Sequence, residues 1–315
     1  MAAVRGARCA ALVLPRPETL TVQISANGIA LEVEDHGPPQ GEPLVLIMGL
    51  GMQLVAWHED FVAMLVARGF RVIRFDNRDI GLSQRFDHLG VPNLAIGGIR
   101  YTLGLSVASP YTVADMAADT VGLLDALGIP KAHICGASMG GMIAQHLGAR
   151  HADRVRSMTL MMTTSGSRRL PQPSMKVRAA LLGRPKDPRS IDSVVDHYVH
   201  LYRVIGSPGY PSPDAVLRER IRRSVTRSHR PQSVARQITA IAADGDRSPM
   251  LAGINAPVHV IHGLADPLVP VEAGRDLQRR IPGARSDLIE GFGHDMPAPL
   301  WPRFVEGIAA VAGRA

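Results

Sequence analysis

The sequence predicts an α/β protein with a mostly parallel eight-stranded sheet, helices on both of its faces and a helical insertion. Short apolar runs alternate with stretches of helical periodicity along most of the 315 residues. Strand-like runs vanish between about 165 and 250, where prolines interrupt helical patterns. They return after that segment, so the insertion divides one sheet domain rather than separating two.

Strands are expected where apolar residues cluster between turn-forming residues. The first two alternate polar and apolar residues on either side of Asn27-Gly28, a pair that favours a two-residue hairpin turn. The run at 44–48 contains no polar residue, as expected for a strand buried on both faces. In order, the expected strands lie at 22–24, 29–33, 44–48, 71–76, 132–135, 155–161, 258–262 and 285–289.

Helices are expected where apolar residues recur with a period near 3.6. The helix at 113–127 has a clear start, because Thr112 can cap it and Asp115 can return the hydrogen bond. Residues 86–111 lack such a pattern and are expected to be irregular. In order, the expected helices lie at 57–66, 113–127, 142–147, 271–280 and 300–312.

These elements define the expected domain organisation. Residues 1–20 form a loose N-terminal tail, residues 21–164 and 251–315 form the sheet domain, and residues 165–250 form a helical cap. Ligands of open α/β sheets bind at the carboxyl ends of the strands, so we expect the cap to lie there.

The charge distribution argues against a nucleic-acid function. The chain has a formal net charge of +7, from 35 Lys and Arg against 28 Asp and Glu. The basic residues are spread along the chain, and their densest group, in 218–230, is expected to form a solvated helix face. No nucleic-acid-binding motif accompanies them, so no nucleic-acid partner is expected.

The cysteines and the apolar runs predict a cytoplasmic protein without a membrane partner. Cys9 and Cys135 are too few for a disulfide framework, which suits a reducing compartment. The apolar run after Arg8 ends at Pro15 and is shorter than the core of a signal peptide. No run approaches the roughly 18 apolar residues of a membrane span.

Ser138 is the candidate nucleophile. It lies in Gly136-Ala137-Ser138-Met139-Gly140, directly after an expected strand and before a helical pattern. A sharp strand-to-helix turn lifts a serine hydroxyl clear of the sheet, and glycines are needed where side chains would collide across the turn. The sequence therefore predicts a nucleophile elbow.

A serine nucleophile needs a base and a carboxylate that orients the base. His294 follows the last expected strand in a glycine-containing loop, and Asp266 lies in the loop after the strand before it. The chain order Ser138, Asp266, His294 is the order expected for this type of hydrolase. The alternatives are weaker, because the other histidines considered fall in strands or beside the elbow helix: His133, His146, His151, His259 and His262. Asp295 adjoins the base, and we expect it to cap a loop.

Acyl transfer also requires donors for the developing oxyanion. The backbone N–H of Met139, directly after the nucleophile, is one candidate, and that of Leu50 in the glycine-rich loop 48–52 is the other. The loop that begins Asp76-Asn77-Arg78 is expected to brace the strand end. Candidate substrate-pocket residues, each equally consistent with core packing, are Met52, Trp57 and Phe292.

These motifs together resemble the α/β-hydrolase-fold serine hydrolases over nearly the whole chain. Within that superfamily the chain is most similar to the bacterial branch of aclacinomycin methylesterases and related carboxylesterases. Many relatives have a histidine before the oxyanion-loop glycine, whereas this chain has Met48, as in the methylesterase-like branch. The segments that carry the resemblance are 48–51, 75–83, 136–141, 262–267 and 291–294.

The resemblance implies a carboxylic ester hydrolase that works through an acyl-enzyme and needs no cofactor or metal. A perhydrolase or haloperoxidase, or a carbon–carbon bond hydrolase, could use the same triad, and a non-enzymatic ligand-binding protein on this scaffold is a further alternative. The expected partner is a small-molecule ester, and the expected state is a monomer or homodimer. No histidine–carboxylate cluster has metal-ligand spacing, and no dinucleotide fingerprint is present.

Overall fold

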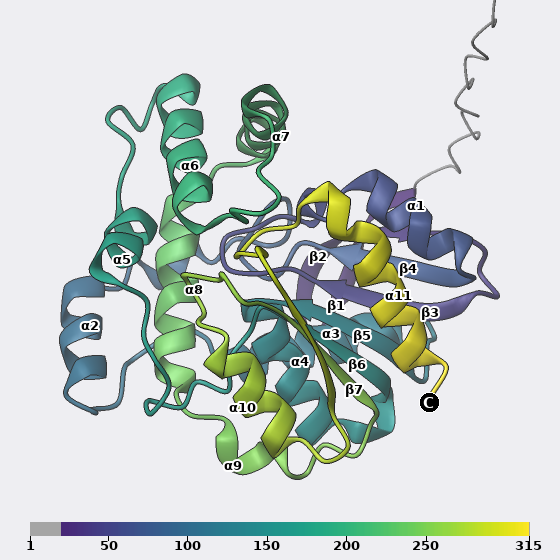
Figure 1. The fold of residues 1–315 in the computed structure, drawn as a ribbon. Helices are drawn as coiled ribbons and strands as arrows, with labels where there is room; N and C mark the ends of the chain where they lie inside the picture. The colour runs from purple at the N-terminus through teal and green to yellow at the C-terminus, as the bar shows by residue number, and fades with distance from the viewer. Residues whose placement is uncertain (1–19, 315) are drawn as a thin grey trace, which may run out of the picture.

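The computed structural model describes residues 20–314, and a single eight-stranded sheet lies at its centre (Figure 1). The strand order is β1-β2-β4-β3-β5-β6-β7-β8. β2 runs antiparallel to β1 and β4, and the remaining neighbours are parallel. The prediction of a mostly parallel eight-stranded sheet is confirmed. The strands are β1 (Leu20–Ala26), β2 (Ile29–His36), β3 (Glu42–Ile47), β4 (Phe70–Phe75), β5 (Ala132–Ala137), β6 (Val155–Met161), β7 (Val258–Gly263) and β8 (Arg285–Ile289).

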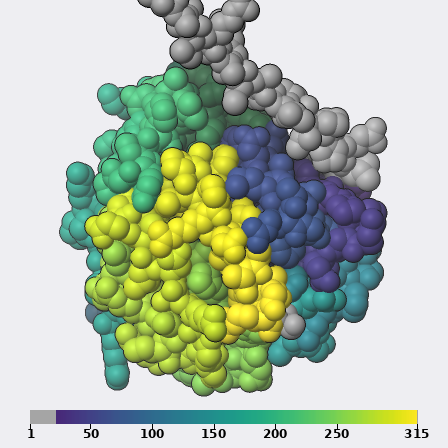
Figure 2. All heavy atoms as spheres, turned by 45° about the vertical axis from the view of Figure 1, so that its right-hand side comes forward, coloured from purple at the N-terminus to yellow at the C-terminus, as the bar shows by residue number. Residues whose placement is uncertain are grey.

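Helices cover both faces of the sheet, and each face has its own apolar core. α3, α4 and α10 pack on one face, and α1 and α11 pack on the other. Figure 2 shows α11 (yellow) beside the blue segment that contains α1, at the other end of the sequence. The helices in the described residues are α1 (Glu59–Ala67), α2 (Leu94–Thr102), α3 (Val113–Ala126), α4 (Met139–Arg150), α5 (Met175–Leu182), α6 (Ile191–Ile205), α7 (Asp214–Arg227), α8 (Pro231–Asp244), α9 (Ser248–Leu251), α10 (Glu272–Arg280) and α11 (Trp301–Ala312).

Local sequence signals explain where several elements begin. The Thr112 hydroxyl accepts from the N–H of Asp115 at 3.0 Å, and the Asp115 carboxylate accepts from the N–H of Thr112 at 2.7 Å. This reciprocal cap starts α3, as predicted. The hairpin turn at Asn27 and Gly28 is also confirmed, and both residues have positive φ angles.

The expectation that 86–111 is irregular was wrong for residues 94–102. Residues Leu94–Thr102 form α2, and the Asn93 side chain caps it by accepting from the N–H groups of Ala95 and Ile96. The helix packs against α8, yet Ile96 and Ile99 stay exposed. The apolar residues of α2 do not form one buried face. The sequence therefore lacks a clear apolar pattern with the 3.6-residue helical period.

Residues 165–250 contain no strand and hold α5 to α8, which Figure 1 shows gathered at one side of the sheet. The predicted solvated arginine face is correct for Arg218 and Arg222, which form exposed ion pairs with Asp196 and Asp192. It was wrong for Arg227, which turns inward.

The remaining expectations concern the N-terminal tail, the two cysteines and membrane spans. The N-terminal tail and Cys9 lie outside the described residues, apart from Leu20, which begins β1. Cys135 lies in β5 and is fully buried, and burial raises the pKa of its thiol. Within residues 20–314, no helix combines the length and apolar character needed to cross a bilayer.

Candidate active site

Ser138 occupies the sharp turn between β5 and α4. Its φ of 54° and ψ of −118° place it in a region that residues other than glycine rarely adopt. A Cβ at Gly136 would lie 2.2 Å from the Gly140 carbonyl oxygen, and one at Gly140 would lie 2.0 Å from the Ile47 carbonyl oxygen. The turn therefore requires both glycines, as the sequence predicts.

The structure brings Ser138, His294 and Asp266 together. The His294 Nε2 lies 3.0 Å from the Ser138 Oγ, and its Nδ1 lies 2.8 Å from the Asp266 Oδ2. A carboxylate can only accept a hydrogen bond, so Nδ1 carries the proton and Nε2 is free to accept from the serine hydroxyl. The geometry is that of a nucleophile, its base and the carboxylate that orients the base.

The Asp266 carboxylate is itself fixed by its own loop. Its Oδ1 accepts from the backbone N–H groups of Leu268 and Val269 at 2.9 and 2.8 Å. The second oxygen is left to face His294, and the side chain is fully buried. These two backbone N–H groups thus hold the Asp266 carboxylate in one orientation.

The competing histidines are engaged elsewhere. The His262 Nε2 is 2.8 Å from the Val269 carbonyl oxygen, and burial lowers the pKa of this ring. His133 contacts the Ser157 hydroxyl at 2.8 Å, and His146 contacts Asp244 at 2.8 Å. Neither contact involves Ser138, which agrees with the choice of His294 as the candidate base.

The loop that carries His294 forms hydrogen bonds with the end of α6 and the connection that follows it. The His294 N–H donates to the Ile205 carbonyl at 2.8 Å, and the Gly293 N–H donates to the Ser207 hydroxyl at 2.9 Å. The Asp295 carboxylate accepts from Ser207. Asp295 therefore caps a loop, as predicted, but the sequence did not indicate that the loop belongs to the helical insertion.

The loop after β3 lies directly against Ser138. A Cβ at Gly49 would lie 3.0 Å from the Ser138 Cβ, so the backbone approaches the nucleophile closely. Met139 is the first residue of α4, and N–H groups in a first turn have no acceptor within the helix. The segments that carry Leu50 and Met139 thus both adjoin Ser138.

Two amide side chains fix this loop. The Asn77 Nδ2 donates to the Met48 carbonyl at 2.9 Å, and the Gln237 Oε1 accepts from the Gly51 N–H at 2.9 Å. Asn77 belongs to the bracing loop predicted from the sequence. Gln237 comes from α8, and no local sequence pattern predicts its role, because its partner Gly51 lies 186 residues away.

Asp76 joins the same loop to the helical insertion. Its carboxylate accepts from the N–H groups of Leu54 and Leu82 at 2.7 and 2.8 Å and from the Arg227 guanidinium at 2.7 Å. A Cβ at Gly81 would lie 1.9 Å from the Asp76 carboxylate, so only glycine fits there. The bracing role predicted for this segment is consistent with these contacts.

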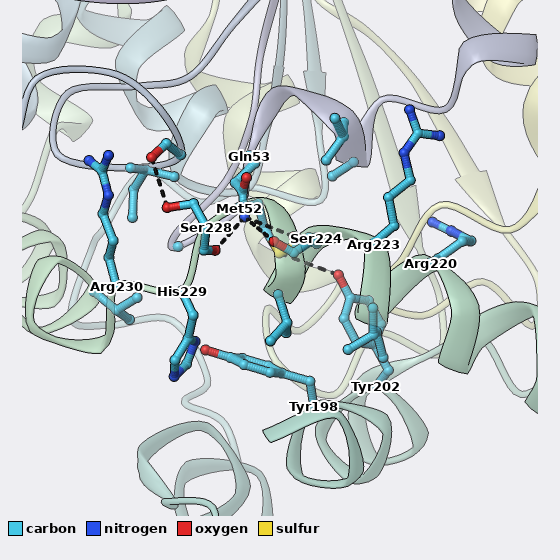
Figure 3. Close-up of a pocket in the computed structure, with 18 of the residues that line it drawn as sticks. Met52, Gln53, Tyr198, Tyr202, Arg220, Arg223, Ser224, Ser228, His229 and Arg230 are labelled. Carbon is cyan, nitrogen blue, oxygen red and sulfur yellow. Dashed lines mark hydrogen bonds between the residues drawn. The ribbon is translucent and has the colours of Figure 1, made fainter. Parts of the chain in front are cut away.

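A cavity of about 110 Å³ lies between this loop and the helices α6 and α7. Met52 lines it, and its Sδ accepts from the Tyr202 hydroxyl at 3.4 Å (Figure 3). The expectation that Trp57 and Phe292 line a pocket is not met at this cavity. Both are fully buried in the apolar core, where Trp57 stacks on Phe61.

The structure offers no assembled metal site in the part that it describes. Among residues 20–314, no group of three or more His, Cys, Asp or Glu side chains is placed to hold an ion. The chemistry that this site can perform with its own groups is nucleophilic attack by the serine, assisted by His294.

Comparisons with known proteins agree with this architecture. A family model described as alpha/beta hydrolase fold matches residues 42–197. The rhodomycin D methylesterase DauP of Streptomyces sp. (strain C5) is 27% identical over 312 residues, covering 92% of this chain and 97% of that protein. The putative carbamate hydrolase RutD of Caulobacter sp. (strain K31) is 29% identical over 296 residues, covering 86% and 90%.

A solved structure gives the same picture. The enol-lactonase from Burkholderia xenovorans LB400 is 25% identical, with a TM-score of 0.67, and the match covers 93% of this chain and 100% of that one. The sheet order, the elbow and the family match point to one conclusion. The chain has the α/β-hydrolase fold.

Proposed function

We propose that the protein is a serine hydrolase that cleaves carboxylic esters through an acyl-enzyme intermediate. The Ser138 Oγ attacks the ester carbonyl carbon while its proton passes to the His294 Nε2. The N–H groups of Leu50 and Met139 stabilise the negative charge on the former carbonyl oxygen. His294 then gives its proton to the departing alcohol oxygen, and Asp266 stabilises the charged imidazole.

Water completes the cycle in this proposal. His294 takes a proton from a water molecule, whose oxygen attacks the acyl carbon and displaces the Ser138 Oγ. The proton returns to the serine, and the carboxylic acid leaves. Every proton transfer uses the one imidazole, so the reaction needs no group beyond those of the chain and water.

The observation that carries the proposal is the pair of contacts on His294, 3.0 Å to Ser138 and 2.8 Å to Asp266. The methylesterase relative, which matches nearly the whole chain, supports an ester as the substrate. We also propose that residues 165–250 act as the cap over a core of 21–164 and 251–315. The contacts of Arg227 and Gln237 with the core loops support that division.

A fluorophosphonate probe and an ester assay test the proposal. We expect the probe to label Ser138 and the Ser138→Ala variant to lose labelling and at least ~10³-fold in kcat. Ser25→Ala, on the exposed side of the edge strand β1, is the matched control and should keep both the labelling of Ser138 and the wild-type kcat. Ester hydrolysis at the wild-type rate by a folded Ser138→Ala variant would exclude the mechanism.

A further inference from the structure

The cavity between the loop after β3 and α6 and α7 has an unbalanced charge. Among the side chains that line it are three arginines and two histidines, and no aspartate or glutamate is among them. The lining groups with ionisable nitrogens are His58, Arg220, Arg223, His229 and Arg230. An electropositive wall without acidic groups favours a ligand that supplies negative charge.

Two of the three arginines are already engaged. Arg223 forms an ion pair with Glu59 at 2.5 Å, and its side chain is mostly exposed. Arg230 donates to the Ser83 carbonyl oxygen at 2.8 Å. Each of these guanidinium groups already has a partner in the protein, although the buried Arg230 Nε has none.

Arg220 differs from both. It comes from the middle of α7, and within residues 20–314 no ion pair or hydrogen bond involves its guanidinium (Figure 3). The positive charge of Arg220 acts to lower the pKa of the Asp295 carboxyl, but the hydrogen bonds of that carboxylate are made with Ser207. Arg220 therefore presents a planar, permanently charged donor group to the cavity.

The opposite wall offers neutral polar groups. The Tyr198 hydroxyl has no hydrogen-bond partner in the described part of the chain, and burial raises the pKa of this phenol, so it stays a neutral donor. The ring of His229 lies edge-on, with its centroid 6.1 Å from that of Tyr198. Leu217, Ile221 and Val225 add apolar surface to the lining of the cavity.

The cavity adjoins the loop after β3, which carries the proposed oxyanion donor. Gly51 and Met52 line it, and they follow Leu50, whose N–H is the proposed oxyanion donor. Neither Ser138 nor His294 lines the cavity. To place a remote group beside Arg220, a substrate with its ester carbonyl at Leu50 would have to extend along this loop past Met52.

We propose that the substrates are esters that carry a second, anionic group, a carboxylate, and that Arg220 binds it in this cavity. This inference rests on the proposed esterase function and names its substrate class. An arginine can pair with a carboxylate through two parallel hydrogen bonds, and such charge-assisted bonds are about twice as strong as neutral ones. The apolar lining would accept the chain between the two ends of the substrate.

The test compares half-esters with diesters. Monomethyl and dimethyl esters of a series of linear dicarboxylic acids differ only in the remote group. We expect the wild type to have a kcat/KM at least ~10-fold higher for the best half-ester than for its diester, after correction for the two reactive ends of the diester. Arg220→Gln should remove that preference by lowering kcat/KM for the half-ester.

Arg218→Gln is the matched control. Arg218 lies on the same helix, is paired with Asp196 on the exposed surface and does not line the cavity. Arg218→Gln and Arg220→Gln each remove one positive charge. The comparison therefore separates recognition by Arg220 from the effect of the net charge of the protein. The half-ester preference should be the same in Arg218→Gln as in the wild type.

A binding measurement keeps this inference separate from the proposed function. In a Ser138→Ala background, calorimetry should show the half-ester binding at least ~10-fold more tightly than the diester, and Arg220→Gln should abolish the difference. Equal kcat/KM values for half-ester and diester in the wild type, with Ser138 still labelled by the probe, would overturn the anion preference alone. Failure of labelling and of hydrolysis of every ester would overturn the proposed function, while the binding comparison would still decide the role of Arg220.

Discussion

The carboxylate of Asp295 accepts hydrogen bonds from both the backbone N–H and the hydroxyl of Ser207. Asp295 directly follows His294, and Ser207 lies two residues after the end of α6. The same hydroxyl accepts from the Gly293 N–H at 2.9 Å. The helical insertion thus holds the loop of the proposed catalytic base on both sides of the histidine.

Loss of the Ser207 hydroxyl should therefore impair both stability and catalysis. Ser207→Ala leaves the Gly293 N–H unpaired in a buried position, at a cost of about 1–3 kcal/mol in the free energy of unfolding. We also expect kcat to fall by ~10-fold or more with a smaller change in KM, because the His294 loop loses two contacts. Urea unfolding and steady-state ester hydrolysis measure the two effects.

Ser212→Ala is the control for that prediction. Ser212 lies in the same connection between α6 and α7, but it uses its backbone carbonyl, which accepts from Arg203 at 2.9 Å. Removing its hydroxyl should change neither the unfolding free energy nor kcat. Equal effects of the two substitutions would contradict a specific role for Ser207.

Gln237 should matter for kcat more than for KM. Its side chain accepts from the Gly51 N–H at 2.9 Å and donates to the Arg78 carbonyl at 3.2 Å. We expect Gln237→Ala to loosen the loop that carries Leu50 and to lower kcat by ~10-fold, because an oxyanion donor acts mainly in the transition state. Gln278→Ala, which removes an exposed contact with Ser286 on β8, should leave kcat unchanged.

Two glycine-to-alanine substitutions should have opposite effects. Gly140→Ala would place a methyl group 2.0 Å from the Ile47 carbonyl oxygen, and we expect it to abolish folding or activity. Gly98 in α2 has nothing within 4 Å of an added Cβ, so Gly98→Ala should stabilise the helix by about 0.5–1 kcal/mol. Thermal unfolding of both variants measures this, and a tolerated Gly140→Ala would contradict the described turn.

Glu34 should make stability depend on pH in acid. Burial alone would raise the pKa of its carboxyl, but the hydrogen bond with His36 and the Arg74 charge lower it from 4.5 to about 2. A depressed folded-state pKa stabilises the fold above the unfolded value, and that contribution is lost as the pH falls from 4.5 toward 2. The contribution is on the order of 3 kcal/mol.

Glu34→Gln should therefore reduce the loss of unfolding free energy between about pH 6 and pH 3, measured by urea unfolding. Glu306→Gln is the matched control, because Glu306 pairs with Arg68 on the exposed surface, where an ion pair contributes little. That variant should follow the wild-type pH profile. A Glu34→Gln profile equal to the wild-type profile would show that the buried pair is not coupled to folding.

The residues of the proposed triad and the elbow could be predicted because their sequence signals are local. Gly136 and Gly140 flank Ser138 within one turn, and their need for small side chains is visible in the sequence. Asp266 and His294 each follow a recognisable strand, and parallel strands bring their carboxyl ends to one edge. The capping pair Thr112 and Asp115 is likewise a three-residue signal.

Other features could not be predicted because they depend on packing between distant segments. Trp57 fits a pocket or a core equally well by residue type, and only the packing of α1 against α11 decides that it is core. Arg227 reads as part of a solvated helix face until the fold places Asp76 beside it. α2 was missed because its exposed isoleucines blur the helical period.

The sequence by itself determined the fold class, the elbow and the three side chains of the proposed triad, since periodicity, glycine geometry and chain order act over short spans. Only the tertiary structure decided which parts of the helical insertion hold the loops of Leu50 and His294. Contacts such as that between Gln237 and Gly51 join residues 186 positions apart, and no local pattern specifies such a pair. The same reason left the position of Arg220 at the cavity to be found in three dimensions.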